Sequence, residues 1–255
     1  MSLRFLSLLL LVGVVLAAEA KDLRVCAEPD NLPFSHEDGS GFENRIAAVL
    51  AQEIEAGLRF EWQPQRRAFV RKTLGEGLCD AWMGVPAGFE RVLATRPYYR
   101  STYVFVFPKT RPLLSFEAQD LRALRIGVQL PGNDLAATPP GHALAAKGAV
   151  EKVVGYTVYG ERPAAARIVD AVAKGELDAG VVWGPAAGFF AAKAALGVAH
   201  AKAPAELDGL PFEFAISIGV KRGQKALRDE LDAALEKRKP EIDAILADYA
   251  VPRVR

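Results

Sequence analysis

The sequence predicts the same order of elements in both halves of the chain, and this repetition limits the fold more than any other feature. In each half, short apolar runs with strand character alternate with longer segments whose apolar residues recur at helical spacing. The predicted strands are residues 23–27, 58–62 and 81–85 in the first half and 124–129, 150–156 and 178–183 in the second. Each crossover is long enough for parallel pairing, so we expect an α/β fold with two lobes, each a mostly parallel sheet flanked by helices.

The two halves also share a short phrase, Gly77-Leu78-Cys79-Asp80-Ala81 in the first and Gly175-Glu176-Leu177-Asp178-Ala179 in the second. A length of 255 residues suits two lobes of roughly 100 residues each. We expect lobe 1 to comprise residues 21–108 and 210–255, and lobe 2 to comprise residues 109–209. The chain then crosses between the lobes twice, and such a double connection forms a hinge.

Residues 1–20 have the pattern of a signal peptide. Arg4 precedes an apolar run from Phe5 to Leu16, and Ala18-Glu19-Ala20 matches a small-x-small cleavage site. The alternative is an uncleaved membrane anchor, but the run is shorter than the roughly 20 residues that a spanning helix needs. We therefore expect an exported protein with no membrane span after the signal is removed.

Export places the two cysteines, Cys26 and Cys79, in an oxidising compartment, where they are candidates for a disulfide bond. Both lie at the edge of a predicted strand in the same half of the chain. The alternative is a pair of buried thiols. Two cysteines without a nearby histidine cannot make a closed zinc site, so we expect no metal site.

Composition and motifs argue against several functional classes. The 32 basic and 31 acidic residues lack the basic excess of a nucleic-acid-binding protein. The sequence contains no G-x-S-x-G, H-E-x-x-H, G-x-G-x-x-G or P-loop motif, and its three histidines are far apart. We therefore expect a protein that is not an enzyme and needs no cofactor.

Residues that favour recognition gather in one stretch, Gln65–Phe107, where arginines are interspersed with tyrosines. Arginine forks suit carboxylates and acidic partners, and Tyr, Trp and Arg are common at interface hot spots. The binding candidates in this stretch are Arg66, Arg67, Arg91, Arg96, Tyr98 and Tyr99, and the equivalent positions of the second lobe add Asn133 and Trp183. The alternative is that the arginines form a solvated helix face while the aromatic residues pack inside the lobes.

Three phrases carry a resemblance to a known family. They are Asn31-Leu32-Pro33-Phe34 after the first strand, Gly77-x-Cys79-Asp80-Ala81 before the third, and Glu90-Arg91 followed by Arg96-Pro97-Tyr98-Tyr99. In these phrases the mature chain resembles the type II periplasmic solute-binding proteins of the polar amino acid class, which form family 3. The resemblance implies a two-lobed fold with a double hinge and a periplasmic location, and it adds Asn31 and Phe34 to the binding candidates.

Longer phrases resemble one branch of that family, the J-type proteins encoded beside quinoprotein methanol dehydrogenases (MxaJ, MoxJ and XoxJ). These phrases are Gly41–Ala47, Pro64–Arg67, Met83–Gly88 and Thr95–Phe105. The similarity leans to the XoxJ type, which accompanies the lanthanide-dependent enzyme. It implies a non-catalytic accessory protein of PQQ-dependent methanol oxidation that binds the dehydrogenase and assists its maturation or activation. The c-type cytochrome of that system is a further candidate partner.

The chain departs from the amino-acid-binding pattern at the ligand positions. Gly88 stands where those proteins usually have Ser or Thr for the ligand carboxylate, and Trp183 stands at the place of the acid for the ligand ammonium. Because a buried ammonium without an acid is costly, we expect ordinary amino acids to bind weakly or not at all. The alternative function is the binding component of an importer for another small organic solute.

Overall fold

The computed structural model describes residues 21–65, 68–130, 137–157, 162–202 and 210–254. Its strands are β1 (Asp22–Ala27), β2 (Asp30–Asn31), β3 (Ser35–His36), β4 (Gly57–Trp62), β5 (Ala81–Pro86), β6 (Leu93–Ala94), β7 (Tyr99–Phe107), β8 (Ile126–Leu130), β9 (Val153–Thr157), β10 (Ala179–Trp183), β11 (Gly197–His200) and β12 (Glu213–Val220). Its helices are α1 (Phe42–Glu53), α2 (Pro139–Ala146), α3 (Ala164–Ala173), α4 (Gly184–Lys193), α5 (Lys225–Lys237) and α6 (Lys239–Asp248), with a π-helix, η1 (Arg71–Gly75), and a 3₁₀ turn, η2 (Leu121–Ala123).

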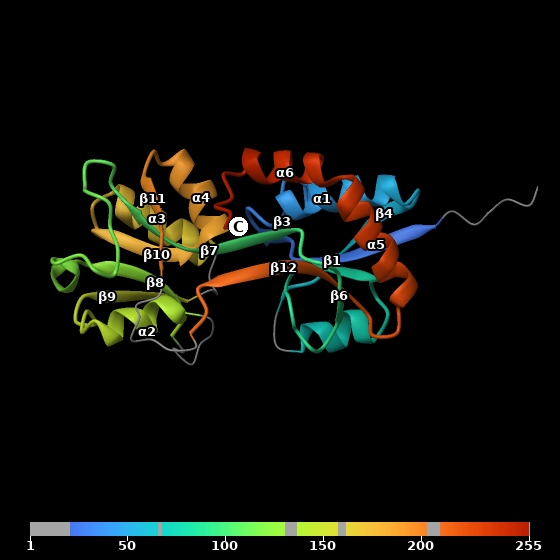
Figure 1. Ribbon diagram of the computed structural model, residues 1–255, viewed down its shortest axis with the longest axis horizontal. Coiled ribbons are helices and arrows are strands. Elements are labelled where there is room, and N and C mark those ends of the chain that lie inside the picture. The colour runs from blue at the N-terminus through green and yellow to red at the C-terminus, as the bar shows by residue number, and fades with distance from the viewer. Residues whose placement is uncertain (1–20, 66–67, 131–136, 158–161, 203–209, 255) are drawn as a thin grey trace, which may run out of the picture.

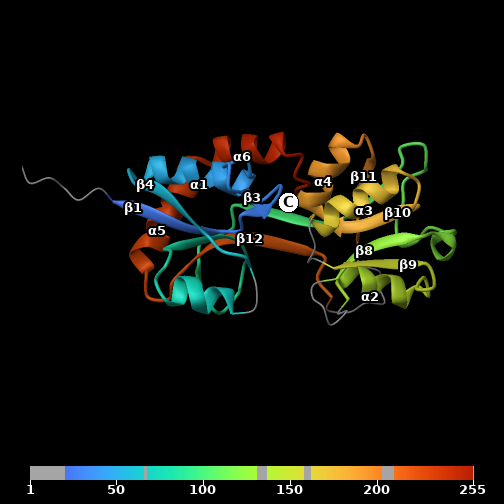
Figure 2. The same ribbon diagram turned by 180° about the vertical axis from the view of Figure 1, so that it is seen from behind.

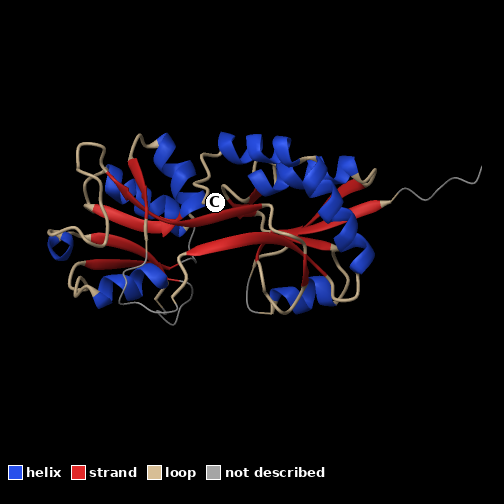
Figure 3. Ribbon diagram, in the orientation of Figure 1, coloured by secondary structure: helices blue, strands red, loops and turns tan. Residues whose placement is uncertain are grey.

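Two α/β halves lie side by side along the long axis of the molecule (Figures 1 and 3), as the repeated order of elements predicts. We call β4-β1-β5-β12 the first sheet and β10-β8-β9 the second sheet, and β7 joins the two. The strands β4, β1 and β5 are parallel, as are β10, β8 and β9, whereas β12 and β7 run antiparallel to their neighbours. Each sheet is therefore a parallel core completed by antiparallel strands.

One strand, β7, belongs to both halves. Residues 99–102 pair with β12, and residues 103–106 pair with β10. The chain returns to the first half through β12, which lies beside β7 in both views (Figures 1 and 2). This pair of neighbouring crossings has the form of the predicted double hinge, while the lobe boundaries at residues 108/109 and 209/210 stay a prediction.

Helices cover both faces of both sheets. In the first sheet, α1, α5 and α6 lie on one face, and η1 packs with the disulfide on the other. In the second sheet, α3 and α4 cover one face and α2 covers the other. This arrangement buries both faces of the central strand β10, which explains why β10 consists of small and apolar residues, whereas the edge strands β4 and β9 are partly exposed.

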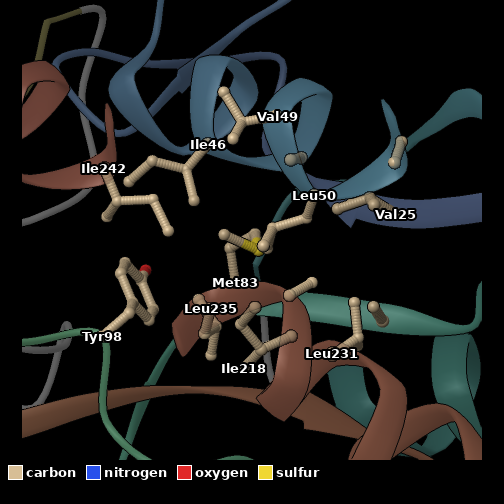
Figure 4. Close-up of a cluster of buried hydrophobic side chains, with 14 of the residues drawn as sticks. Val25, Ile46, Val49, Leu50, Met83, Tyr98, Ile218, Leu231, Leu235 and Ile242 are labelled. Atoms are coloured by element: carbon tan, nitrogen blue, oxygen red, sulfur yellow. The ribbon is translucent and has the colours of Figure 1, made fainter. Parts of the chain in front are cut away.

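The largest cluster of buried side chains lies between α1, α5, α6 and the first sheet (Figure 4). On α1, Phe42, Ile46, Val49 and Leu50 recur at the spacing of one helix face, so they all point to the sheet. Leu231 of α5 is fully buried in the same cluster. The packing of this face fixes α1, and with it the loop that enters α1, against β5.

The predicted disulfide is confirmed. Cys26 of β1 and Cys79 before β5 are bonded, with Cα atoms 5.5 Å apart. Both residues are buried against Phe69 and Leu74, so the bond ties η1 to the face of the first sheet opposite α1. Residues 1–20, which the sequence predicts to be a signal peptide, lie outside the described residues.

Two local features help to define these elements. The prolines at 139 and 140 occupy the first positions of α2, where a missing backbone N–H costs little. The strand β7 begins at Tyr99, because Tyr99–Thr102 pair with β12. The short strands β2, β3, β6 and β11 were not predicted, since each has too few residues to show a period.

Candidate functional site

A pocket of about 200 Å³ lies where the two halves meet, and we call it the cleft pocket. Its described lining residues come from both halves and are Asn31, Phe34, Glu43, Gln65, Met83, Gly84, Tyr99, Trp183 and Ile216. Asn31, Phe34, Tyr99 and Trp183 were predicted to bind a ligand or partner, and the structure brings these four together. Whether they bind one stays a prediction.

The loop between β2 and α1 is tied to the helix start, and this places Asn31 and Phe34 at the pocket. The backbone N–H groups of Phe42 and Glu43 donate to the carbonyls of Pro33 and Phe34, at 2.8 and 2.9 Å. A Cβ at Gly41 would lie only 2.2 Å from the Phe34 carbonyl oxygen, so a larger residue there would push the loop away. Backbone packing against the first turn of α1 therefore explains the motif Asn31-Leu32-Pro33-Phe34.

Glu43 is the residue that sequence reasoning missed. Only 7% of its surface is exposed, and its one hydrogen-bonded side-chain partner among the described residues is Tyr98, whose hydroxyl donates to Oε1 at 3.4 Å. Burial raises the pKa of Glu43 to about 8, and the hydrogen bond from Tyr98 opposes this rise. At neutral pH the carboxyl group is therefore mostly protonated.

The sequence carries a signal that could have identified this acid. Glu43 precedes Ile46, Ala47 and Leu50 by three, four and seven residues, and all three are buried. That spacing places an acidic side chain on the apolar face of α1. A carboxyl on such a face has to be neutral or paired, which makes it a candidate functional group.

The strand β5 makes room for this carboxyl at Gly84. A Cβ added there would lie 2.5 Å from Glu43 Oε1, and the backbone adopts a φ of +74°, which favours glycine. The Gly84 N–H donates to the Tyr98 hydroxyl at 3.2 Å. Glu43, Tyr98 and Gly84 thus form a connected group behind the cleft pocket.

Tyr98 and Tyr99 have different positions although they are adjacent. Tyr99 lines the cleft pocket, whereas Tyr98 lies behind it and is held by the group just described. Burial holds the pKa of both phenols well above its ordinary value, and the nearby Glu43 carboxyl adds to the rise. Both therefore stay protonated, so Tyr98 remains a hydrogen-bond donor over the range in which Glu43 titrates.

Trp183 brings the second half to the pocket from the end of β10. Its ring lies edge-on to Tyr103 and Phe214, with centroids 5.4 and 5.7 Å apart. Its backbone N–H donates to the Gln129 side chain at 3.0 Å. Trp183 is partly buried and also packs against the core of the first sheet, so it both closes the pocket and joins the two halves.

The predicted arginines do not gather in the cleft pocket. Arg91 lies at a separate side pocket of about 240 Å³, lined also by Gln65, Ala68, Phe69, Val70, Trp82 and Phe89. Arg96 is drawn to α5, where its backbone N–H and guanidinium bond Asp232 and Glu236 at 2.7 and 2.9 Å. Arg96 takes this position because the outer face of α5 is acidic. The sequence pattern did not predict that α5 lies next to the loop that holds Arg96. Arg66, Arg67 and Asn133 lie outside the described residues.

Between residues 21 and 254, with the gaps given above, no group of three or more His, Cys, Asp and Glu side chains could hold a metal ion. Within the same ranges, no helix has both the length and the apolar character needed to cross a membrane.

Comparison with known proteins supports the resemblance found in the motifs. A model of the bacterial extracellular solute-binding proteins, family 3, matches residues 23–251. Protein MoxJ of Methylorubrum extorquens is 34% identical over 250 residues, which cover 92% of this chain and 82% of that protein. Protein MoxJ of Paracoccus denitrificans is 32% identical over 262 residues, which cover 92% of this chain and 90% of that protein.

Two solved structures have the same fold over almost their whole length. MxaJ from Methlophaga aminisulfidivorans superposes with a TM-score of 0.79 at 28% identity, covering 91% of this chain and 100% of that chain. The periplasmic binding protein XoxJ from Methylobacterium extorquens superposes with a TM-score of 0.76 at 34% identity, covering 91% of this chain and 99% of that chain. The predicted two-lobed type II fold is thereby confirmed, and the chain belongs to the bacterial extracellular solute-binding proteins, family 3.

Proposed function

We propose that this chain is a non-catalytic periplasmic accessory protein of PQQ-dependent methanol oxidation. It binds the quinoprotein methanol dehydrogenase, of the lanthanide-dependent type, and assists its maturation or activation. The proposal rests on the similarity to MoxJ, MxaJ and XoxJ over most of the chain. The c-type cytochrome of the same system is a second candidate partner.

The composition of the cleft pocket favours a protein partner over a transported amino acid as the ligand. Its described lining contains three aromatic rings and no basic side chain that could hold a ligand carboxylate. Arg91, one of the predicted binding residues, lies at the side pocket instead. The cleft volume of about 200 Å³ is also smaller than the roughly 300–1,000 Å³ of sites that enclose a whole small molecule.

Trp183 is the best residue for a test, because it lies at the pocket and is only partly buried. Tyr98 is less suitable, since its replacement would remove a buried core side chain. Arg96 supplies a matched control, because its bonds to α5 place it outside the cleft lining.

The experiment measures binding of purified lanthanide-type methanol dehydrogenase to the immobilised mature chain. We expect wild type and Arg96→Ala to bind alike, and Trp183→Ala to bind at least about tenfold more weakly, as for an interface hot spot. If neither this enzyme nor its cytochrome binds wild type, the proposal is wrong. A small organic solute that raises the melting temperature would then favour the importer function.

A further inference from the structure

The described lining of the cleft pocket includes an acidic side chain but no basic one. Glu43 is its one acidic side chain among the described residues, and those residues include no Lys, Arg or His. The other polar side chains, Asn31, Gln65 and Tyr99, are neutral at pH 7. A cation that entered the pocket would therefore meet an acid and no competing positive charge from the described wall.

The charged groups around Glu43 are paired elsewhere. On α1 itself, Arg45 bonds Asp248 at 3.3 Å. On β3, His36 lies 2.9 Å from Asp38. From the β5 and β7 side, the groups that face Glu43 are the Gly84 backbone and the hydroxyls of Tyr98 and Tyr99. Among the described residues, none supplies a positive charge to the carboxyl.

The space around this acid is built to hold it. Glycine at position 84 leaves room for Oε1, and the Tyr98 hydroxyl orients the carboxyl from behind. A glutamate at a purely structural position on an apolar helix face costs free energy that leucine or glutamine would avoid. The cost is offset when a ligand supplies a positive charge, because an opposite charge favours the ionised form.

The walls of the pocket suit the same kind of ligand. Phe34, Tyr99 and Trp183 present aromatic rings, and the face of an aromatic ring attracts an ammonium or guanidinium group. Met83 adds a polarisable thioether. The small volume fits one side chain rather than a whole cofactor.

We propose that the cleft pocket receives the ammonium or guanidinium group of a lysine or arginine side chain from a protein partner, and that Glu43 is the acid that pairs with it. The inference rests on the proposed function, because it names the chemical group by which the partner enters the cleft. It also agrees with the expectation that free amino acids bind weakly, because their carboxylate would find no basic group in the described lining.

Ionisation of Glu43 gives the proposal a specific signature. The carboxyl is mostly protonated at pH 7 in the free protein, since burial raises its pKa to about 8. A bound cation favours the carboxylate, so binding releases about one proton to the buffer. Heats of binding measured at pH 7 in phosphate and in a zwitterionic buffer such as MOPS then differ by about the difference between the ionisation enthalpies of the two buffers.

The probe is n-butylammonium chloride, with sodium butyrate and n-butanol as controls of the same length. Calorimetry should detect saturable binding of the ammonium probe alone, with release of about one proton. Glu43→Gln should bind it at least about tenfold more weakly and release none, while Glu37→Gln, at an exposed position, should match wild type. Equal binding by Glu43→Gln, or no binding by folded wild type, would overturn the proposal.

Arg66 and Arg67 need a separate control, because they follow Gln65 in the sequence and lie outside the described residues. In the variant Arg66→Gln/Arg67→Gln, binding of n-butylammonium should equal that of wild type. Binding that appears only in this variant would show that the chain itself supplies the cation, and it would refute the assignment to a partner.

Binding of the dehydrogenase to wild type and to Glu43→Gln distinguishes this inference from the proposed function. If the enzyme binds wild type and Glu43→Gln alike, the cation site is wrong and the accessory function stands. If n-butylammonium binds through Glu43 but the enzyme does not bind, the accessory function is wrong and the cation site stands. We expect the enzyme to bind wild type at least about tenfold more tightly than Glu43→Gln.

Discussion

Replacement of Glu43 by Gln should change how the stability of the protein depends on pH. The folded pKa of about 8 lies above the ordinary value of 4.5, so the folded state keeps a proton that the unfolded chain loses. The contribution of protonated Glu43 to the free energy of unfolding is therefore complete below about pH 4.5, decreases as the pH rises, and levels off above about pH 8. A difference of about 3.5 in pKa corresponds to a loss of about 5 kcal/mol in all, of which about 3 kcal/mol is lost by pH 7.

The glutamine side chain has the same shape and does not titrate, so it removes this loss. We expect wild type and Glu43→Gln to unfold at similar urea concentrations at pH 4.5. At pH 9 the variant should be more stable than wild type by several kcal/mol, because the ionised carboxyl no longer has to be buried. Urea unfolding of both proteins from pH 4.5 to 9 measures the difference directly.

Glu37→Gln is the control for other effects of removing an acid, because Glu37 is exposed in the loop before α1. Its difference from wild type should stay within about 0.5 kcal/mol at every pH. The reasoning about Glu43 is refuted if the difference between Glu43→Gln and wild type is the same at pH 4.5 and pH 9.

Three further predictions concern stability. Gly84→Ala should cost several kcal/mol in urea unfolding, since its Cβ would lie 2.5 Å from Oε1 of the buried Glu43 carboxyl group. Gly77→Ala, with the same sign of φ and no atom within 4 Å, should cost about 1–2 kcal/mol. Cys26→Ala/Cys79→Ala should lose about 4 kcal/mol, because the bond closes a loop between residues 53 positions apart. Leu231→Ala should lose about 2–5 kcal/mol, since it leaves a cavity at a fully buried position.

Each of these predictions has an outcome that would contradict it. Equal losses for the two glycine variants would mean that the carboxyl moves freely and does not need the space at position 84. A disulfide-free variant as stable as wild type would show that the unfolded chain is not constrained by the bond. A loss below 1 kcal/mol at Leu231 would mean that α5 collapses into the space without strain.

The main elements could be predicted because their patterns are local. The helix α1 follows from Ile46, Val49, Leu50 and Ile54 at helical spacing, and the strand β10 follows from a short apolar run between Gly175 and Gly184. The disulfide could be predicted as well, because an exported chain with two cysteines offers one pairing.

The candidate site was less predictable because it depends on contacts between distant segments. The position of Arg96 is decided by acids on α5 about 140 residues away in the sequence. The role of Glu43 depends on Gly84 and Tyr98, which only the fold brings next to α1. Periodicity could have placed Glu43 on the apolar face of α1, but it could not show that this side chain also lines a pocket.

The position of β12 has a consequence for how the chain is made. In the first sheet β12 lies between β5 and β7, yet it is the last strand to be synthesised. Until residues 213–220 emerge, β5 and β7 present edges that lack their partner β12. By then all strands of the second sheet, together with β7 and β11, have already been synthesised. The half that begins the sequence therefore finishes folding last, in contrast to the usual N-terminal-first order of folding during translation.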